Sequence, residues 1–350
     1  ATRLWDRVTD AGRQASVLNV PVTFPPQRDV QRMVSGFLSP GVDKAAHPDE
    51  FRNELDGMGY RIDVNAKLGH DDDKTAFVED AHRTLERRFE AFQSVLDRDD
   101  WDLFFGVFMT TDRVNHFLFR DYEHDGDNGE AFLEFYEKVD EYIGEIRASL
   151  PDDVTLVVAS DHGFTSLEYE VHCNAWLEEE GWLAYEDDDH DELGDISGDT
   201  RAYSFIPGRF YINLDGREPD GAVPESEYDA VRSELKADLE ALDGPDGRPV
   251  ADRVVETEDA FRGDHDDIAP DLVVVPNHGF DLKSGFKSHD DVFGTGPRNG
   301  MHSFDNASLF VDDPDVTIDE ADIYDIAPTI LDLLEVDYTR TEFDGATLCR

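Results

Sequence analysis

The sequence predicts an α/β fold, with a mainly parallel central sheet flanked by helices and an inserted cap subdomain. Apolar runs of strand length alternate along the chain with longer segments of helical period. The short runs are continuously apolar, which is typical of strands covered on both faces. With 350 residues the chain is long enough to bury a large core.

Five apolar runs are predicted as strands of the core. Each is rich in valine, leucine or phenylalanine, which favour extended backbone. They lie at 15–20, 103–109, 154–159, 272–275 and 308–311.

Helices are predicted between these strands. The segment at 4–8 has the composition of the middle of a helix, and further helices are expected at 74–97, 131–149 and 324–334. The helix at 74–97 carries one apolar stripe at helical spacing, made of Phe77, Ala81, Leu85, Phe89, Phe92 and Leu96.

The pattern changes between residues 187 and 263, where acidic and Gly/Pro-rich loops dominate. They surround a short strand at 210–214 and an amphipathic helix at 225–242. We expect 187–263 to be a cap inserted into a core formed by 1–186 and 264–350. The acidic clusters are interpreted as solvated loops, because none has the spaced ligands and glycine of a calcium-binding loop.

The charge of the chain is extremely negative. Asp and Glu number 82 against 31 Lys and Arg, a formal charge of −51. Such a field opposes nucleic-acid binding through a basic patch and attraction to anionic membranes. It favours a protein of a halophile's cytoplasm, where salt screens the repulsion between carboxylates; an ordinary acidic protein is the alternative.

Cysteines and apolar segments indicate an intracellular, cytoplasmic protein. Cys173 and Cys349 lack the spacing of a zinc site or a disulfide framework. No apolar run approaches the ~18 residues of a membrane span, and no leader pattern opens the chain.

Two Asp/His pairs follow predicted strands. Asp112 and His116 come after the strand at 103–109 and would share one face of a helix. Asp161 and His162 directly follow the strand at 154–159. Open α/β sheets bind ligands at the carboxyl ends of their strands, so the repeated pattern predicts a metal site there.

A third candidate ligand is His302, in a Gly-x-His segment just before the last predicted strand. With Asp112 and His116 it would complete a three-residue site that leaves a coordination position open.

Several enzyme classes are excluded by their missing motifs. The chain has no GxxxxGK[ST] phosphate loop, and Gly294 and Gly296 do not stand in GxGxxG spacing after a strand. Ser35 lacks the GxSxG context of a serine esterase.

Together these motifs resemble the alkaline phosphatase superfamily, and within it the type I phosphodiesterase/nucleotide pyrophosphatase branch of phosphohydrolases and phosphomutases. The resemblance rests on ordered segments along nearly the whole chain: VLNVPVTFPP at 17–26, TDRVNHF at 111–117, SDHGF at 160–164, FYINL at 210–214, the Gly-x-His at 300–302 and DIAPTIL at 325–331.

The resemblance implies two metal ions, zinc or else manganese or iron, that clamp an in-line phosphoryl transfer. Asp112, His116 and His302 would bind one ion, and Asp161 and His162 the other. The family also supplies an Asp from its first strand and a Thr or Ser nucleophile shortly after it.

Neither of those two family residues is assigned in this sequence. Thr23 and Ser35 fall after the expected position, and Asp6 falls on a predicted helix. We expect the nucleophile upstream of Ala1, on an N-terminal segment outside the sequence; loss of half of one metal site is the alternative.

The sequence therefore predicts a metal-dependent hydrolase of small-molecule phosphate esters or nucleotides. The alternatives are a phosphoglycerate mutase-like phosphomutase or a sulfatase, and, from another class, a non-catalytic binding protein on the same fold. The physiological substrate and the oligomeric state do not follow from the motifs.

Overall fold

The computed structural model describes residues 2–98, 100–187, 189–261, 263, 268–289 and 291–350. The chain divides into two compact units. The first comprises Ala1–Phe164 and His302–Arg350, and the second comprises Thr165–Met301. Each unit is described below by itself.

The first unit is built on a four-stranded sheet of order β3-β2-β1-β4. Its central strand β1 pairs in parallel with β2 and with β4, and β2 pairs antiparallel with β3. A second, antiparallel pair is formed by β5 and β15. The strands are β1 (Ala15–Val20), β2 (Arg32–Ser35), β3 (Ala46–His47), β4 (Leu103–Gly106), β5 (Val157–Ala159) and β15 (Leu309–Val311).

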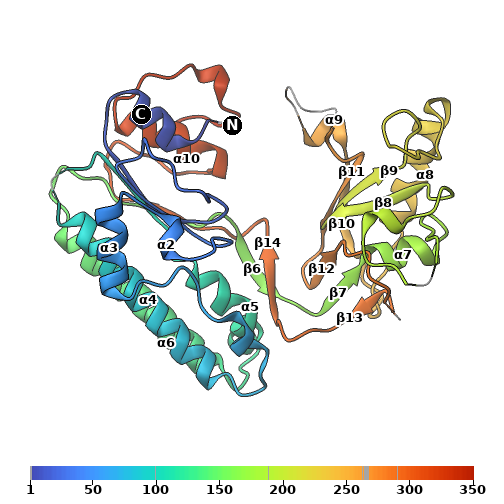
Figure 1. Cartoon of the computed structure of the whole chain (residues 1–350), viewed down its shortest axis with the longest axis horizontal. Coiled ribbons are helices and arrows are strands. Elements are labelled where there is room, and N and C mark those ends of the chain that lie inside the picture. Colours follow the sequence, from blue (N-terminus) through green and yellow to red (C-terminus); the bar gives the residue numbers. More distant parts are fainter. Residues whose placement is uncertain (1, 99, 188, 262, 264–267, 290) are drawn as a thin grey trace. The chain divides into compact units, whose positions relative to one another are not determined.

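Helices cover both faces of this sheet (Figure 1). One face packs against α3, α4, α5 and α6, and the other against α1 and α10. Successive side chains of β1 point to opposite faces of the sheet, so Leu18 is buried in the hydrophobic cluster on the first face and Val17 in the cluster on the second. The helical elements are α1 (Leu4–Asp10), α2 (Val42–Ala45), α3 (Asp49–Met58), η1 (Ala66–His70), α4 (Thr75–Leu96), α5 (Thr110–Glu123), α6 (Gly129–Ser149), α10 (Ile323–Leu333) and η5 (Arg340–Glu342).

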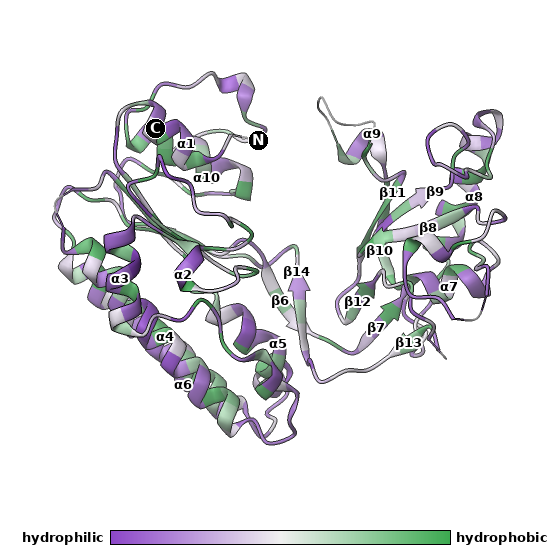
Figure 2. Cartoon of the chain, in the orientation of Figure 1, coloured by the Kyte–Doolittle hydropathy of each residue, from purple (hydrophilic) through white to green (hydrophobic). Residues whose placement is uncertain are grey.

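The long helices form where apolar residues recur at helical spacing, and the predicted helices at 74–97 and 131–149 are confirmed as α4 and α6. Figure 2 shows hydrophobic and hydrophilic residues alternating along both. On α4, Phe89 stacks on Tyr142 of α6, with ring centroids 3.9 Å apart. Burial of these stripes holds the helices against the sheet.

Stability of this helix pair is expected to depend on pH through His82. Its ring lies 5.4 Å from that of Phe135, and burial lowers its pKa below the usual 6.5 against the opposing field of Glu134. The folded state therefore favours the neutral ring. The free energy of unfolding should fall as the pH drops through 6.5 and level off once the folded-state pKa is passed.

Urea unfolding between about pH 8 and about pH 5, where histidines titrate, measures this dependence. The variant His82→Gln should show a shallower fall than the wild type. Equal slopes in the two proteins would contradict the assignment to His82.

The second unit contains a four-stranded sheet of order β10-β11-β9-β8, in which all pairs are antiparallel, and a three-stranded sheet of order β12-β7-β13. Its strands are β7 (Tyr169–His172), β8 (Ala202–Ile206), β9 (Arg209–Ile212), β10 (Ala251–Glu256), β11 (Leu272–Pro276), β12 (Phe280–Lys283) and β13 (Phe293–Gly294). Its helical elements are α7 (Cys173–Glu179), η2 (Leu193–Asp195), η3 (Glu225–Glu227), α8 (Tyr228–Glu240) and α9 (Thr257–Ala260). The strands β6 (Gly163–Ser166) and β14 (Gly300–Ser303) pair where the chain passes between the units.

Three predicted strands lie outside the four-stranded sheet. The runs at 154–159 and 308–311 form the separate antiparallel pair β5 and β15, and the third lies in the second unit. The run at 272–275 forms β11, but it lies between antiparallel neighbours in the second unit rather than in the core sheet. An apolar run shows that a strand is buried and not which sheet buries it. The predicted cap, 187–263, falls within the second unit, which extends further at both ends because residues from Val171 to Leu177 and from Leu272 to Val292 share its core.

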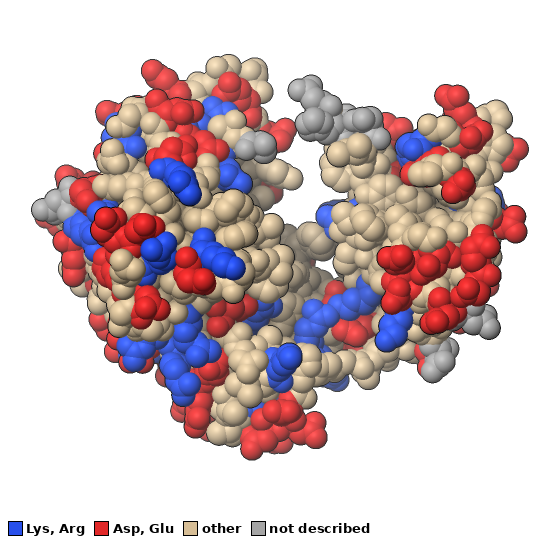
Figure 3. Space-filling model, in the orientation of Figure 1, with Lys and Arg blue, Asp and Glu red and all other residues tan. Residues whose placement is uncertain are grey.

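The mainly parallel sheet of the prediction is represented by β2, β1 and β4, and the structure as a whole is a mixed α/β fold. Acidic side chains are spread over the visible face of each unit (Figure 3). Among the residues that the structure describes, no helix combines the length and the apolar character needed to span a membrane.

Candidate metal centre

The first Asp/His pair lies on α5, as predicted. The chain leaves β4 at Gly106, earlier than expected, and enters the helix at Thr110. One helical turn separates Asp112 from His116, so both side chains point the same way, with His116 Nε2 3.5 Å from Asp112 Oδ1.

The second pair directly follows the C-terminal end of β5, as the sequence predicts. His162 Nδ1 donates to the carbonyl oxygen of Gly163 at 3.1 Å, which leaves a lone pair on Nε2 for a ligand. Asp161 is 83% exposed, and its Oδ2 lies 3.6 Å from His162 Nε2. Of the two side chains, His162 is therefore the one held in place by a hydrogen bond to the backbone.

The start of β6, directly after His162, is closely packed around Gly163. A Cβ at this position would collide with the side chains of Asn306 and Ser303. These two side chains are hydrogen-bonded to each other, and Asn306 Nδ2 donates to the carbonyl oxygen of Phe164 at 2.8 Å. Both belong to the segment that carries His302, so the contacts join the second and third motifs.

The third motif places His302 on β14, against the residues of the other two. His302 Nε2 lies 3.1 Å from Asp112 Oδ1. The His302 ring centroid is 3.9 Å from that of His162 and 4.9 Å from that of His116. Segments up to 190 positions apart in the chain thus meet at one point.

The structure brings Asp112, His162 and His302 into a group whose ligand atoms all lie within 4.8 Å of one another. One carboxylate and two imidazoles are a donor set that suits zinc and related divalent ions. His116 borders this group through Asp112, and Asp161 borders it through His162. The group takes members from both ligand sets that the family resemblance implies.

The electrostatics keep Asp112 charged. Burial opposes its ionisation, but the hydrogen bond from His302 and the nearby His116, His302 and Arg113 outweigh burial, so the pKa of Asp112 lies below its usual value. Carboxylate ligands must be deprotonated to bind a metal, and this condition is met at neutral pH.

Arg113, next to Asp112, was not singled out in the sequence. Its Nη2 donates to Asp63 Oδ2 at 2.7 Å, and its guanidinium lies 4.4 Å from the ring centroid of Phe37. An arginine beside a predicted metal ligand is the signal that points to it. Because Asp63 and Phe37 both contact it, the guanidinium of Arg113 is held beside Asp112.

The hydroxyls of Thr23 and Ser35, the two residues considered as nucleophiles from the sequence, are both hydrogen-bonded to the backbone. Thr23 is buried and its Oγ1 donates to the carbonyl oxygen of Val20 at 2.7 Å. Ser35 is also buried and donates to the carbonyl oxygen of Thr23 at 3.0 Å. Their roles are explained by local backbone hydrogen bonding.

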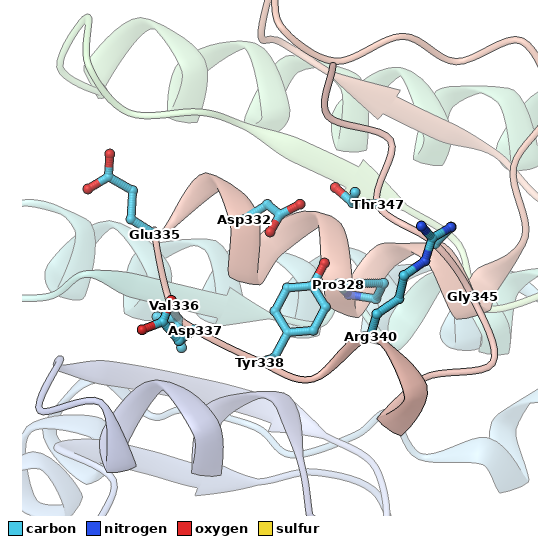
Figure 4. Close-up of a pocket in the computed structure, with 10 residues that line it drawn as sticks. Pro328, Asp332, Glu335, Val336, Asp337, Tyr338, Arg340, Gly345 and Thr347 are labelled. Carbon is cyan, nitrogen blue, oxygen red and sulfur yellow. The ribbon is translucent and has the colours of Figure 1, made fainter.

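A separate cavity of about 570 Å³ lies between α10 and the C-terminal segment (Figure 4). Asp332, Tyr338 and Arg340 are among the residues that line it, and none of the five proposed metal ligands does. The cavity is therefore not part of the Asp/His group.

The fold and the site together define an α/β protein with an Asp/His group of metal-binding type, contributed by α5, β14 and the residues that follow β5. The chain belongs to the type I phosphodiesterase / nucleotide pyrophosphatase family, whose model matches residues 1–305. This family acts on phosphate esters and nucleotides and is typically dependent on two metal ions. The resemblance stated from the motifs is thereby confirmed at the level of the family.

Solved structures similar to this chain include human ectonucleotide pyrophosphatase / phosphodiesterase 5, at 14% identity and a TM-score of 0.49, covering 99% of this chain and 73% of that one. The murine protein of the same name matches at 15% identity and a TM-score of 0.46, covering 97% and 72%. No curated protein matches the chain.

Proposed function

We propose that this protein is a metal-dependent hydrolase of phosphate esters, of the phosphodiesterase/nucleotide pyrophosphatase or phosphatase type. The observation that carries the proposal is the meeting of Asp112, His162 and His302, from three separate segments, with ligand atoms within 4.8 Å. Membership of a phosphodiesterase family supports the reaction class.

The proposed ligands are those expected from the motifs. Asp112, His116 and His302 would hold one divalent ion, and Asp161 and His162 would contribute to a second, with zinc favoured over manganese or iron by the imidazole-rich set. Bound metal would supply the positive charge that stabilises phosphoryl oxygens and activates a nucleophile.

Contacts among the chain's own residues set the charge and the orientation of the proposed ligands. Asp112 stays ionised and accepts from His302, which holds both side chains toward one point. The Gly163 carbonyl fixes His162 with Nε2 free to bind. In a protein of charge −51, an anionic substrate needs a local positive centre, and this group is where one would form.

The nucleophile of the proposed reaction would be a Thr or Ser, and neither Thr23 nor Ser35 is assigned to that role, because both hydroxyls are buried and donate to backbone carbonyl oxygens.

The test is hydrolysis of nitrophenyl phosphate monoesters and diesters and of nitrophenyl sulfate by the protein in high salt. Chelation of the metal should lower kcat/KM for phosphate esters more than about 100-fold, since metal charge contributes several kcal/mol to such barriers. Zinc, manganese and iron are then added back separately.

The other outcomes separate the alternatives. Cleavage of the sulfate ester alone would replace the proposal by a sulfatase, and phosphoryl transfer between two positions of a phosphosugar acid without hydrolysis would replace it by a phosphomutase. Metal binding without turnover would leave a binding protein on the same fold. We also propose a salt-rich cytoplasm as its setting, which a higher unfolding free energy in molar salt would support.

A further inference from the structure

Arg88, in the middle of α4, is a fully buried cation. Its exposed fraction is 0%, whereas the neighbouring Arg87 is 37% exposed and pairs with Glu90 at 2.7 Å. Removing a guanidinium from water costs several kcal/mol unless charges and hydrogen bonds compensate it. Its position therefore needs a reason other than packing volume.

The hydrogen-bond partners of Arg88 are uncharged and come from separate segments. Its Nη2 donates to the carbonyl oxygens of Ile62 at 2.6 Å and Arg61 at 3.2 Å, and its Nη1 donates to Thr110 Oγ1 at 3.2 Å. With its amide turned, Asn19 accepts from Nη2 at 3.1 Å. Among the ion pairs of the described residues, none joins Arg88 to a carboxylate.

Two of these partners, Thr110 and Ile62, are close in sequence to residues beside the metal centre. Thr110 is the first residue of α5, two positions before Asp112. Ile62 directly precedes Asp63, whose carboxylate holds Arg113. One guanidinium thus ties the start of the helix that carries Asp112 to the segment that holds the next residue.

We propose that Arg88 is a positioning residue for the metal centre: through Thr110 and the 61–63 segment it fixes the first turn of α5, so that Asp112 meets His302. This inference rests on the proposed function. A site of this kind needs its ligands held to within about 0.5 Å, and hydrogen bonds to the supporting backbone are the usual means. A buried donor with five N–H groups can join three segments where a neutral side chain cannot.

The test compares two replacements of the buried Thr110. Thr110→Val keeps the shape and removes the acceptor, and Thr110→Ser keeps the acceptor. Zinc is titrated into each folded protein by calorimetry in high salt. We expect Thr110→Val to raise the Kd for zinc about 10-fold or more, as for other partners of metal ligands, and Thr110→Ser to bind within about twofold of wild type.

A second comparison uses the two adjacent arginines. Arg88→Met should weaken zinc binding at least as much as Thr110→Val, and Arg87→Met, on the same helix, should leave the Kd unchanged. If Thr110→Val lowers the unfolding free energy but binds zinc like wild type, Arg88 has a structural role alone and the inference is overturned. If the wild-type protein binds no zinc, manganese or iron, the proposed metal centre itself fails and the inference falls with it.

Discussion

Asp112→Ala is expected to lower the affinity for zinc by more than about 100-fold and to abolish metal-dependent hydrolysis. Loss of a partner of a metal ligand already costs 10- to 100-fold, and Asp112 is the shared acceptor at the centre of the group. Its Oδ1 lies 3.1 Å from His302 and 3.5 Å from His116. Equilibrium dialysis with metal analysis, together with the nitrophenyl ester assay, measures both effects.

The matched control is Glu123→Gln, which removes a carboxylate charge from the far end of the same helix. It should keep wild-type metal content and kcat/KM. Asp112→Ala itself should fold, since an acidic residue in the first turn contributes only about 0.3–1 kcal/mol through the helix dipole. Wild-type zinc affinity in folded Asp112→Ala would remove Asp112 from the ligand set.

The parts of the fold that follow from local pattern were predictable from the sequence. The stripe on α4 gave a helix one residue from each predicted end, and the run at 15–20 is β1. Strand ends were less predictable: the apolar run at 103–109 continues past β4 because Phe108 packs, partly buried, against the core after the strand has ended. Hydrophobicity reports burial and does not distinguish a strand from the turn that follows it.

The candidate site was predictable as motifs but not as a geometry. Asp112 and His116 could be paired from their spacing in a helix, whereas the contact between Asp112 and His302 depends on how a segment 190 positions away returns to the first unit. Arg88 carries a signal in the sequence, because it stands three residues after Leu85 and four before Phe92, on the buried stripe. A charged residue on an apolar face points to a buried polar network.

In the second unit, Asp271 is the group whose removal should cost most stability. It is 2% exposed and stands directly before β11. Arg217 donates to both of its oxygens, at 2.9 and 2.8 Å, and Tyr228 Oη and the backbone N–H of Ile212 each donate at 2.6 Å. The hydrogen bond to Asp271 raises the pKa of Arg217, and burial with the Asp271 contact raises that of Tyr228 to about 12.

Asp271→Ala is therefore expected to lower the unfolding free energy by about 3–5 kcal/mol, because the N–H of Ile212 and the hydroxyl of Tyr228 lose their acceptor and Arg217 keeps only Glu218, among the described residues, as a charged partner. The control Asp252→Ala, at a side chain 54% exposed and 3.9 Å from Arg253, should change it by less than about 1 kcal/mol. Denaturant unfolding in high salt, followed through the fluorescence of the buried Trp182, measures both.

The lower unfolding free energy of Asp271→Ala should arise from the Arg217 side chain that remains without Asp271, rather than from the loss of an attractive ion pair. Replacing both groups, as in Arg217→Met with Asp271→Ala, removes the two charges together, so the double variant should be more stable than Asp271→Ala alone. Equal or greater destabilisation of the double variant would instead show that the pair itself holds β9 against β11. The N–H of Ile212 and the hydroxyl of Tyr228 lose their acceptor in both variants, so the two variants differ only at Arg217, which in the double variant also gives up its bonds to Glu218 and to the carbonyl oxygen of Ile212.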